Sequence, residues 1–257
     1  MFERLDNRYF FRGKLILENE MHIGSGRGDG TTDALVVKDF NGIPYIPGSS
    51  LRGVLRSTIE RIASSIGLNP CLLEEDNPCV TTSKALQHEF KELLKGKNYS
   101  EITAFLTDST KVCPVCQLFG STVVASKIRI TDLSLNGTFN TTAVRHGVAI
   151  NRDTETAQDK AKFDFETVPK GIRFDFELIG ENLVNKDLSL LALGIQEMVD
   201  GNFWLGGNTA RGLGKCKLEE LEIKYFDNLK EYLTNGKKFK KLEYDDFTSK
   251  ISDLIQG

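Results

Sequence analysis

Four of the five cysteines in this sequence fall within one stretch of chain, and two of them have the spacing of metal ligands. Cys113-Pro-Val-Cys116 lets one tight turn present two thiolates to the same ion. A structural zinc ion takes four soft ligands, so the others must lie upstream, where Cys79 is joined by either Cys71 or His88. Unpaired thiols in a loop are the alternative, but so many cysteines in a segment poor in core-forming residues favour zinc. A fully thiolate-bound ion leaves no position for water, so the site would be structural.

Two glycine-rich loops carry basic residues. The first, residues 24–30, contains Arg27, but it lacks the helix that a dinucleotide-binding loop requires and the Gly-Lys-Ser/Thr of a P-loop. The second, Gly206–Lys215, contains Arg211 as well as Lys215, four glycines and no acidic residue. Such loops can present backbone amides to phosphates, and two of them indicate a long polyanion. For the first loop, a plain flexible connection fits the spacing equally well.

Hydroxyl and basic side chains also gather at the start of a predicted helix, namely Ser49, Ser50, Arg52 and Arg56. Free backbone amides and the helix dipole favour an anion at this end. Arg52 and Arg56 are one helical turn apart, so both can face the same ligand. The sequence therefore predicts a phosphate site, with a capped surface helix bearing exposed arginines as the alternative.

Hydrophobic periodicity indicates the elements that must position these groups. Residues 51–66 and 187–199 have helical spacing, the first behind a serine cap, and 83–94 is a charged helix candidate. Cys216 falls in the last strand and is expected to be a core residue. One sheet with helices on one face, as in a split βαβ unit, is the predicted arrangement. The predicted strands are 9–19, 34–40, 127–135, 144–150, 162–168, 172–179 and 215–226.

Composition narrows the classes of protein. With 257 residues, 40% of them hydrophobic and 27% charged, the chain is neither disordered, collagenous nor a coiled coil. A net charge of −3 means that any contact with nucleic acid must use local basic stripes. No apolar run approaches the ~20 residues that span a bilayer, and the first residues mix both charge signs, so a cytoplasmic protein without a membrane partner is expected.

Several motifs taken together resemble the RAMP-superfamily backbone subunits of type III CRISPR effector complexes, which polymerise along a guide RNA. The resemblance runs in order from about Tyr9 to Phe226, and its cysteine insertion is similar to that of zinc-containing branches. The motifs are His22-Ile-Gly-Ser-Gly with Asp33, Ile46-Pro-Gly-Ser-Ser-Leu-Arg-Gly53, Cys116-Gln-Leu-Phe-Gly-Ser121, the hairpin-like Arg145-His-Gly-Val-Ala-Ile-Asn-Arg-Asp-Thr-Glu-Thr-Ala, and the Gly206–Gly214 loop.

This resemblance implies an α+β fold: a modified ferredoxin-like, RRM-like core over residues 1–226, followed by an appendage at 227–257 that is expected to be solvated. Residues 67–119 would form an inserted zinc-binding subdomain, and 139–168 a thumb β-hairpin that wedges between bases of the guide–target duplex. Neighbouring copies would stack into a filament with the other effector subunits. The residues expected to contact RNA are His22, Gly24, Arg27, Ser49, Ser50, Arg52, Arg56, Arg145, Arg152, Asn208, Arg211 and Lys215.

In cleaving members of the family an aspartate in the loop after the first strand supports cutting of the target RNA, and Asp33 falls at that position. RNA carries its own nucleophile, so cleavage needs an aligned 2′-hydroxyl, charge neutralisation and a proton acceptor. Asp33 would hold a divalent cation such as Mg²⁺ or act as the general base. No second carboxylate forms an obvious pair with it, although Asp29 is near in sequence. A turn aspartate that merely begins the next strand is the alternative.

Three other functions remain open at the level of sequence. The first is a non-cleaving structural subunit of the same complex. The second is a guide-processing endoribonuclease that uses His22 or His146 as base. The third is an unrelated zinc-stabilised enzyme acting on a small phosphorylated substrate. The last is disfavoured because no compact group of acid, base and nucleophile accompanies the glycines.

Overall fold

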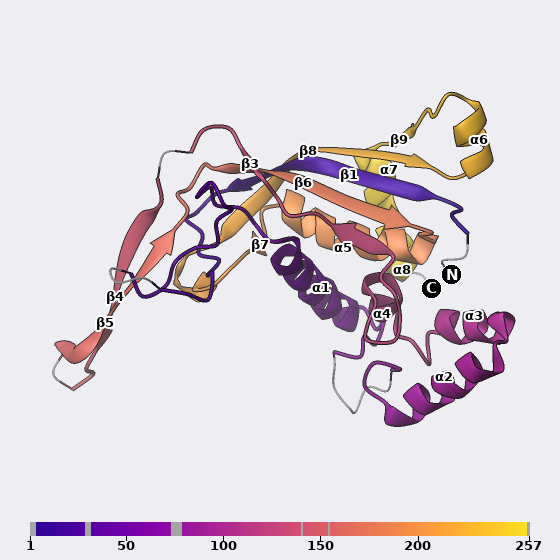
Figure 1. Cartoon of the computed structure of the whole chain (residues 1–257), viewed down its shortest axis with the longest axis horizontal. Helices are drawn as coiled ribbons and strands as arrows, with labels where there is room; N and C mark the ends of the chain where they lie inside the picture. Colours follow the sequence, from indigo (N-terminus) through magenta and orange to yellow (C-terminus); the bar gives the residue numbers. More distant parts are fainter. Residues whose placement is uncertain (1–3, 29–31, 73–78, 140, 154, 256–257) are drawn as a thin grey trace.

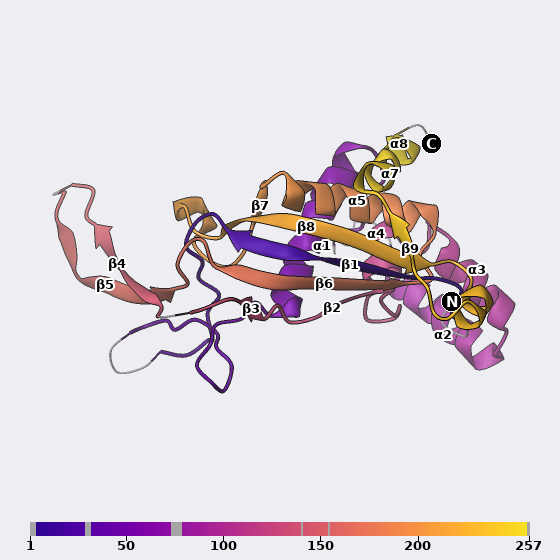
Figure 2. The same cartoon turned by 90° about the horizontal axis from the view of Figure 1, so that it is seen from above.

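The computed structural model describes residues 4–28, 32–72, 79–139, 141–153 and 155–255. A seven-stranded antiparallel sheet has the strand order β2-β6-β1-β8-β7, with β3 also paired to β6 and β9 to β8. Helices lie against one face of this sheet (Figures 1 and 2). The strands are β1 Arg8–Leu17, β2 Ile128–Ile130, β3 Leu135–Asn136, β6 Arg173–Glu181, β7 Phe203–Trp204, β8 Lys215–Phe226 and β9 Lys240–Leu242.

Alternation of side chains separates the two faces of the central strands. On β1, Phe11 and Leu15 are fully buried under the helices. Arg12 lies on the opposite face, where it forms an ion pair of 2.6 Å with Glu177, its cross-strand partner on β6. Burial of the first set stabilises the sheet against the helix layer, and charged pairs line the outer face.

Two helices form the layer under the sheet, α1 Gly48–Ser65 and α5 Asn185–Val199, and they pack against each other. Both were predicted from their periodicity. The predicted serine cap of α1 is wrong: the residue before the helix is Pro47, and Asp132 Oδ1 instead accepts a 2.8 Å hydrogen bond from the Gly48 amide. The cap thus comes from a distant segment. Within the described residues, no helix is long and apolar enough to cross a membrane.

Three short helices occupy the region after α1: α2 Lys84–Gly96, α3 Tyr99–Thr107 and α4 Pro114–Phe119. The predicted charged helix corresponds to α2, whose N-cap Ser83 accepts a hydrogen bond from the Leu86 amide. The region is less poor in core residues than its composition suggested, because Phe90 of α2 and Phe105 of α3 are buried with ring centroids 5.3 Å apart. These helices lie to one end of the molecule (Figure 1).

Two predicted strands are largely absent. Residues 34–40 form only isolated bridges, among them Gly24 with Val36 and Ala34 with Phe165. Residues 127–135 shrink to the three residues of β2 and the first residue of β3. Both segments have suitable propensity, but neither has a continuous neighbouring strand to pair with, and β propensity depends on that context.

A separate antiparallel pair, β4 Ala143–Ile150 and β5 Ala157–Thr167, extends away from the main sheet (Figures 1 and 2). Its base is attached to the loop after β1, because Ala34 bridges to Phe165 and Met21 to Val168. The hairpin therefore continues from the edge of the region that holds Asp33.

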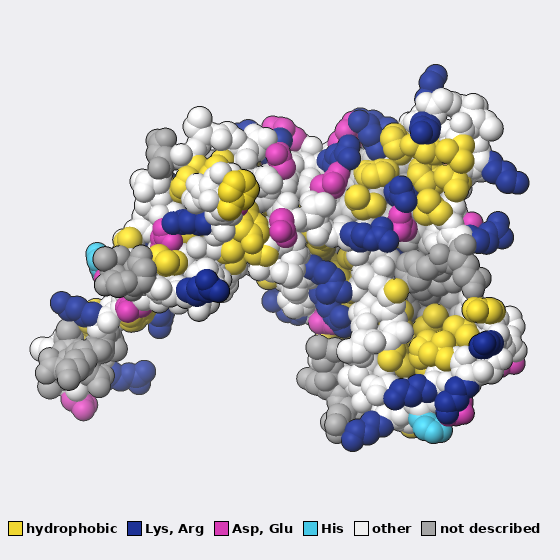
Figure 3. Space-filling view, viewed as in Figure 1, with side chains coloured by type: hydrophobic (Ala, Val, Ile, Leu, Met, Phe, Trp, Pro, Cys, Tyr) yellow, Lys and Arg dark blue, Asp and Glu magenta, His cyan; other side chains and the backbone are white. Residues whose placement is uncertain are grey.

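The residues after β8 form α6 Leu229–Thr234, β9, α7 Tyr244–Ser249 and α8 Ile251–Ile255. The expectation of a solvated tail is wrong, because β9 pairs with β8 and Phe247 of α7 is fully buried beside Phe11. The helices α7 and α8 pack on α5. Apolar side chains gather on the surface at the α6 end of this tail (Figure 3).

Candidate metal centre and nucleic-acid interface

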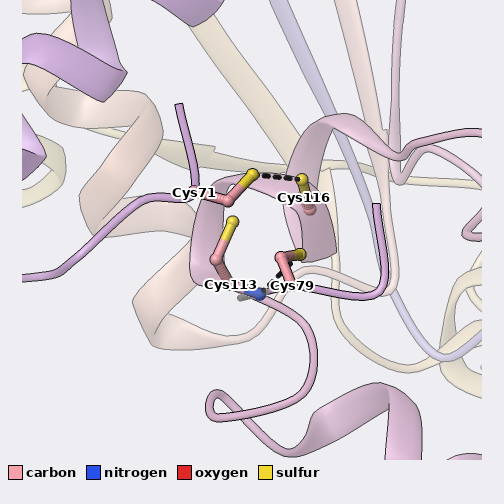
Figure 4. A group of neighbouring side chains, drawn as sticks. All are labelled: Cys71, Cys79, Cys113 and Cys116. Carbon is pink, nitrogen blue, oxygen red and sulfur yellow. Dashed lines mark hydrogen bonds between the residues drawn. The ribbon is translucent and has the colours of Figure 1, made fainter. Parts of the chain in front are cut away.

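The four cysteines of the predicted zinc set converge in the structure (Figure 4). All four are buried, and their Sγ atoms lie within 4.8 Å of one another. Cys113 is the N-cap of α4 and Cys116 lies in its first turn, so the helix start orients both thiols as the two-residue spacing predicted. His88, the alternative ligand, has a side chain 77% exposed and lies 4.0 Å from Glu92 on its own helix. The buried set is therefore completed by Cys71.

Electrostatics in the cluster favour a bound cation. Mutual hydrogen bonding with Cys113 and Cys71 lowers the pKa of the Cys116 thiol to about 7, and the same kind of contact lowers the pKa of Cys79 while raising that of Cys113. Four adjacent thiolates repel one another unless a cation lies between them. Zn–S bonds of about 2.3 Å place the sulfurs of a tetrahedral site roughly 3.8 Å apart. Cys71 and Cys116 are already 3.6 Å apart, so the residues fit such an ion.

The start of α1 holds only part of the predicted phosphate site. Ser49 is exposed and Ser50 half-buried, so both reach solvent. Arg52 turns inward, where it donates to the Phe119 carbonyl and lies 5.7 Å from the centre of that ring. Arg56 also turns inward and bonds the Gly120 carbonyl at 3.2 Å. Contact of either arginine with RNA stays a prediction.

The Gly206–Gly214 loop meets the chain that follows β1. The Gly207 amide donates to the His22 carbonyl at 2.8 Å, and the Gly214 amide to that of Glu20 at 2.7 Å. Gly206 has a φ of +84°, and a Cβ there would overlap the His22 carbonyl oxygen, so this position requires glycine. The His22 ring is fixed by its Nδ1, which lies 2.6 Å from the Glu166 carbonyl oxygen. The first motif and the closing loop therefore converge, whereas α1 begins against Asp132.

Asp33 lies exposed at the base of the hairpin. Its Oδ2 accepts a hydrogen bond of 2.9 Å from the Asp164 amide on β5, and no partner is found for Oδ1 among the described residues. The Asp164 carboxylate in turn lies 2.6 Å from Nδ1 of His146, its cross-strand partner on β4. The Asp164 amide thus orients one oxygen of an exposed carboxylate. Asp29 lies outside the described residues.

Glu166 organises this loop and was not predicted. It accepts hydrogen bonds from the Val36 amide at 2.9 Å, from Lys38 Nζ at 2.5 Å and from the Thr142 hydroxyl. Burial raises the pKa of Glu166, but the hydrogen bonds from Lys38, Thr142 and Val36 outweigh it and hold the pKa below the usual range. Side chains alternate between the two faces of a strand, so Glu166 falls on the face opposite Phe163 and Phe165. No local sequence pattern therefore marks Glu166 as buried.

The remaining residues of the predicted RNA surface fall into two groups. Arg145 pairs with Glu20 at 2.7 Å, and Lys215 pairs with Glu18 at 2.9 Å. Gly24, Arg27, Arg152 and Arg211 are exposed, and Asn208 is half-buried with a φ of +58°. On the face shown in Figure 3, basic side chains are spread over the molecule with acidic ones among them. No single basic patch appears on that face.

Comparison with known proteins identifies the family. Residues 14–217 match the RAMP superfamily model. The chain is 25% identical over 233 residues to "CRISPR system Cms endoribonuclease Csm3" of Methanothermobacter thermautotrophicus, with 86% of this chain and 87% of that protein covered. The protein of the same name from Methanocaldococcus jannaschii is 27% identical, with 92% of this chain and 88% of that protein covered. The one from Streptococcus thermophilus is 26% identical, with 82% of this chain and 87% of that protein covered. The chain belongs to the RAMP superfamily.

Proposed function

We propose that this chain is a guide-RNA-binding backbone subunit of a type III CRISPR effector complex and cleaves the paired target RNA. The observation that carries the proposal is the exposed Asp33 carboxylate, one oxygen of which is held at the hairpin base by the Asp164 amide. The relatives named endoribonuclease Csm3, which match most of the chain, support this assignment. Other effector subunits and further copies of the chain are the proposed protein partners.

The strand order β2-β6-β1-β8 with α1 and α5 on one face supports a ferredoxin-like core for residues 1–226. The β4–β5 hairpin would act as the thumb against the guide–target duplex. Guide phosphates would lie along the junction of His22 with the Gly206–Gly214 loop, where the side chains of Arg27 and Arg211 are exposed. Ser49 and Ser50 at the α1 start would add contacts.

At the hairpin base, a kinked target strand would place its 2′-hydroxyl in line with the scissile phosphorus. The Asp164 amide holds Oδ2 of Asp33, and Oδ1 would take the hydroxyl proton. A divalent cation such as Mg²⁺, when bound at the same carboxylate, supplies charge neutralisation for the phosphate oxygens. Attack of the 2′-oxygen on phosphorus would break the bond to the 5′-oxygen, which takes a proton from water, so that the products are a 2′,3′-cyclic phosphate and a free 5′-hydroxyl.

Asp33→Ala in the assembled complex tests the proposal. Target cleavage should fall by at least ~100-fold, the scale of a general base, while guide binding persists. The matched control is Asp253→Ala on α8, an exposed aspartate remote from the hairpin, which should cleave normally. Unchanged cleavage by the Asp33 variant would assign the chain a purely structural role. Cutting of free precursor RNA by the isolated chain would instead favour a guide-processing enzyme based on His22 or His146.

The cysteine cluster is proposed to hold one structural zinc ion in the 67–119 segment. Elemental analysis of the purified protein should find about one zinc per chain, and Cys113→Ser should lose it. Because Cys113 begins α4, metal removal by a chelator should also lower the thermal midpoint. A wild-type protein free of zinc and indifferent to chelator would contradict this part of the proposal.

A further inference from the structure

Arg56 connects helix α1 to the cysteine cluster through three hydrogen bonds. Its Nη2 donates to Cys116 Sγ at 3.3 Å and its Nη1 to the Gly120 carbonyl at 3.2 Å. Its Nε donates to Glu60 Oε1 at 2.8 Å, one turn further along α1. The side chains of Arg56 and Glu60 are 14% and 13% exposed, so the contact is largely shielded from water. Each of the three guanidinium nitrogens therefore donates to an acceptor inside the protein.

The position of the Gly120 carbonyl explains why the Arg56 side chain points into the protein. The last carbonyls of a helix have no partner within the helix, and Gly120 follows the end of α4. A cation is also favoured at this end of a helix. Arg52, one turn earlier on α1, bonds the neighbouring Phe119 carbonyl in the same way. The two arginines together seat the end of α4 on α1.

Charge supplies the second argument. Four thiolates around a divalent ion leave a net charge of −2, and burying that charge is unfavourable without compensation. Within the described part of the chain, the Thr81 hydroxyl, also at 3.3 Å, and Arg56 both donate to Cys116 Sγ. Among the hydrogen bonds to cysteine sulfur in the described residues, the one from Arg56 is the only one from a cationic group. Figure 4 shows Cys116 on the α4 ribbon, facing Cys71.

We propose that Arg56 is a positioning residue of the metal centre: it seats Cys116, compensates the thiolate charge and ties the centre to the helix whose start is proposed to meet guide RNA. Glu60 orients the guanidinium. This inference rests on the proposed zinc ion. It assigns Arg56 to the protein interior rather than to the RNA phosphates.

The first test measures zinc affinity by competition with a chromophoric chelator. Arg56→Gln should weaken zinc binding by about 10–100-fold, the usual effect of losing a group that supports a metal ligand. Glu60→Gln, which keeps the arginine but removes its orienting carboxylate, should have a smaller effect. The matched control is Arg61→Gln, an exposed arginine on the same helix, which should bind zinc like the wild type. Wild-type affinity in the Arg56 variant would overturn the inference.

The second test separates positioning from a general loss of structure. A hydrogen bond to a metal-bound thiolate lowers its nucleophilicity, so in the zinc-loaded Arg56→Gln protein alkylation should speed up at Cys116 ahead of the other cysteines, as read by mass spectrometry. Equal acceleration at all four cysteines would mean that the variant has merely loosened, and would overturn the assignment. If the wild type holds no zinc, the metal proposal fails first. If zinc is present and neither readout changes, the role of Arg56 alone fails.

Discussion

Replacing Glu166 by glutamine tests how the Asp33 loop is held. The carboxylate accepts hydrogen bonds from the Val36 amide and from Lys38, and its side chain is only 6% exposed. Glutamine keeps the shape of the side chain but removes its charge. Its NH2 group also replaces one of the two acceptor oxygens, so that it faces a donor, either the Val36 amide or Lys38. Lys38 is 31% exposed and can rehydrate, so the net loss is about one charge-assisted hydrogen bond, or roughly 1.5–3 kcal/mol at neutral pH.

The sign of the pH dependence follows from the lowered pKa of Glu166. An unfolded glutamate titrates near pH ~4.3, so the unfolded chain binds the proton first as pH falls. The stabilisation is therefore complete above that value and is lost as pH falls through the lower pKa of the folded state. Glutamine does not titrate, so the difference between the two proteins should shrink toward acid.

Urea unfolding of both proteins between about pH 7 and about pH 3, which extends below the pKa of an unfolded glutamate, measures this difference. Glu219→Gln, an exposed glutamate on β8, is the control and should behave as the wild type throughout. A difference for Glu166→Gln that is constant with pH would assign its cause to packing and refute the argument. Cleavage should also fall, since Glu166 holds the segment adjoining Asp33.

Two further substitutions probe the scaffold. Asp187→Ala breaks a buried 2.6 Å ion pair and leaves the Lys127 ammonium buried without its partner. Denaturant titration should therefore find a free energy of unfolding that is lower by about 3–5 kcal/mol. A change near zero would show that the lysine becomes hydrated in the variant. Gly206→Ala adds a Cβ that overlaps the His22 carbonyl, whereas Gly212, at a φ of +85°, has no atom within 4 Å of such a Cβ. Gly212→Ala should therefore lower the free energy of unfolding by only about 1–2 kcal/mol. Gly206→Ala should lower it clearly more and should also weaken binding of guide RNA. Equal effects of the two substitutions would contradict the predicted junction.

Periodicity was sufficient for the elements that form a regular layer. Alternation over 172–179 and helical spacing over 187–199 correspond to β6 and α5, because each element buries one face against the same core. The Cys113–Cys116 spacing likewise indicated two neighbouring thiols, since that geometry is set by one helix turn. What these patterns have in common is that their physical cause is local.

The tertiary structure decided everything that depends on a distant partner. Residues 34–40 have strand composition but lack a continuous neighbouring strand, so they remain a loop with single bridges. Cys71 rather than His88 completes the buried cluster because the chain returns there, and sequence distance carries no sign of it. The sequence pattern places Glu166 on a polar face, but the residue is buried, and its backbone donor Val36 lies 130 residues away in the chain.

For Arg56, the sequence determined the position of the side chain on its helix, and the tertiary structure decided which groups it contacts. The sequence determined that a guanidinium lies one turn from Arg52 on an amphipathic helix, and that pattern suits a phosphate as well as it suits any other acceptor. The direction was decided by the carbonyl at the end of α4, 64 residues along the chain, and by a cysteine sulfur beside it. Unsatisfied acceptors at a buried helix end bind a nearby cation, and only the packed structure shows where that end lies.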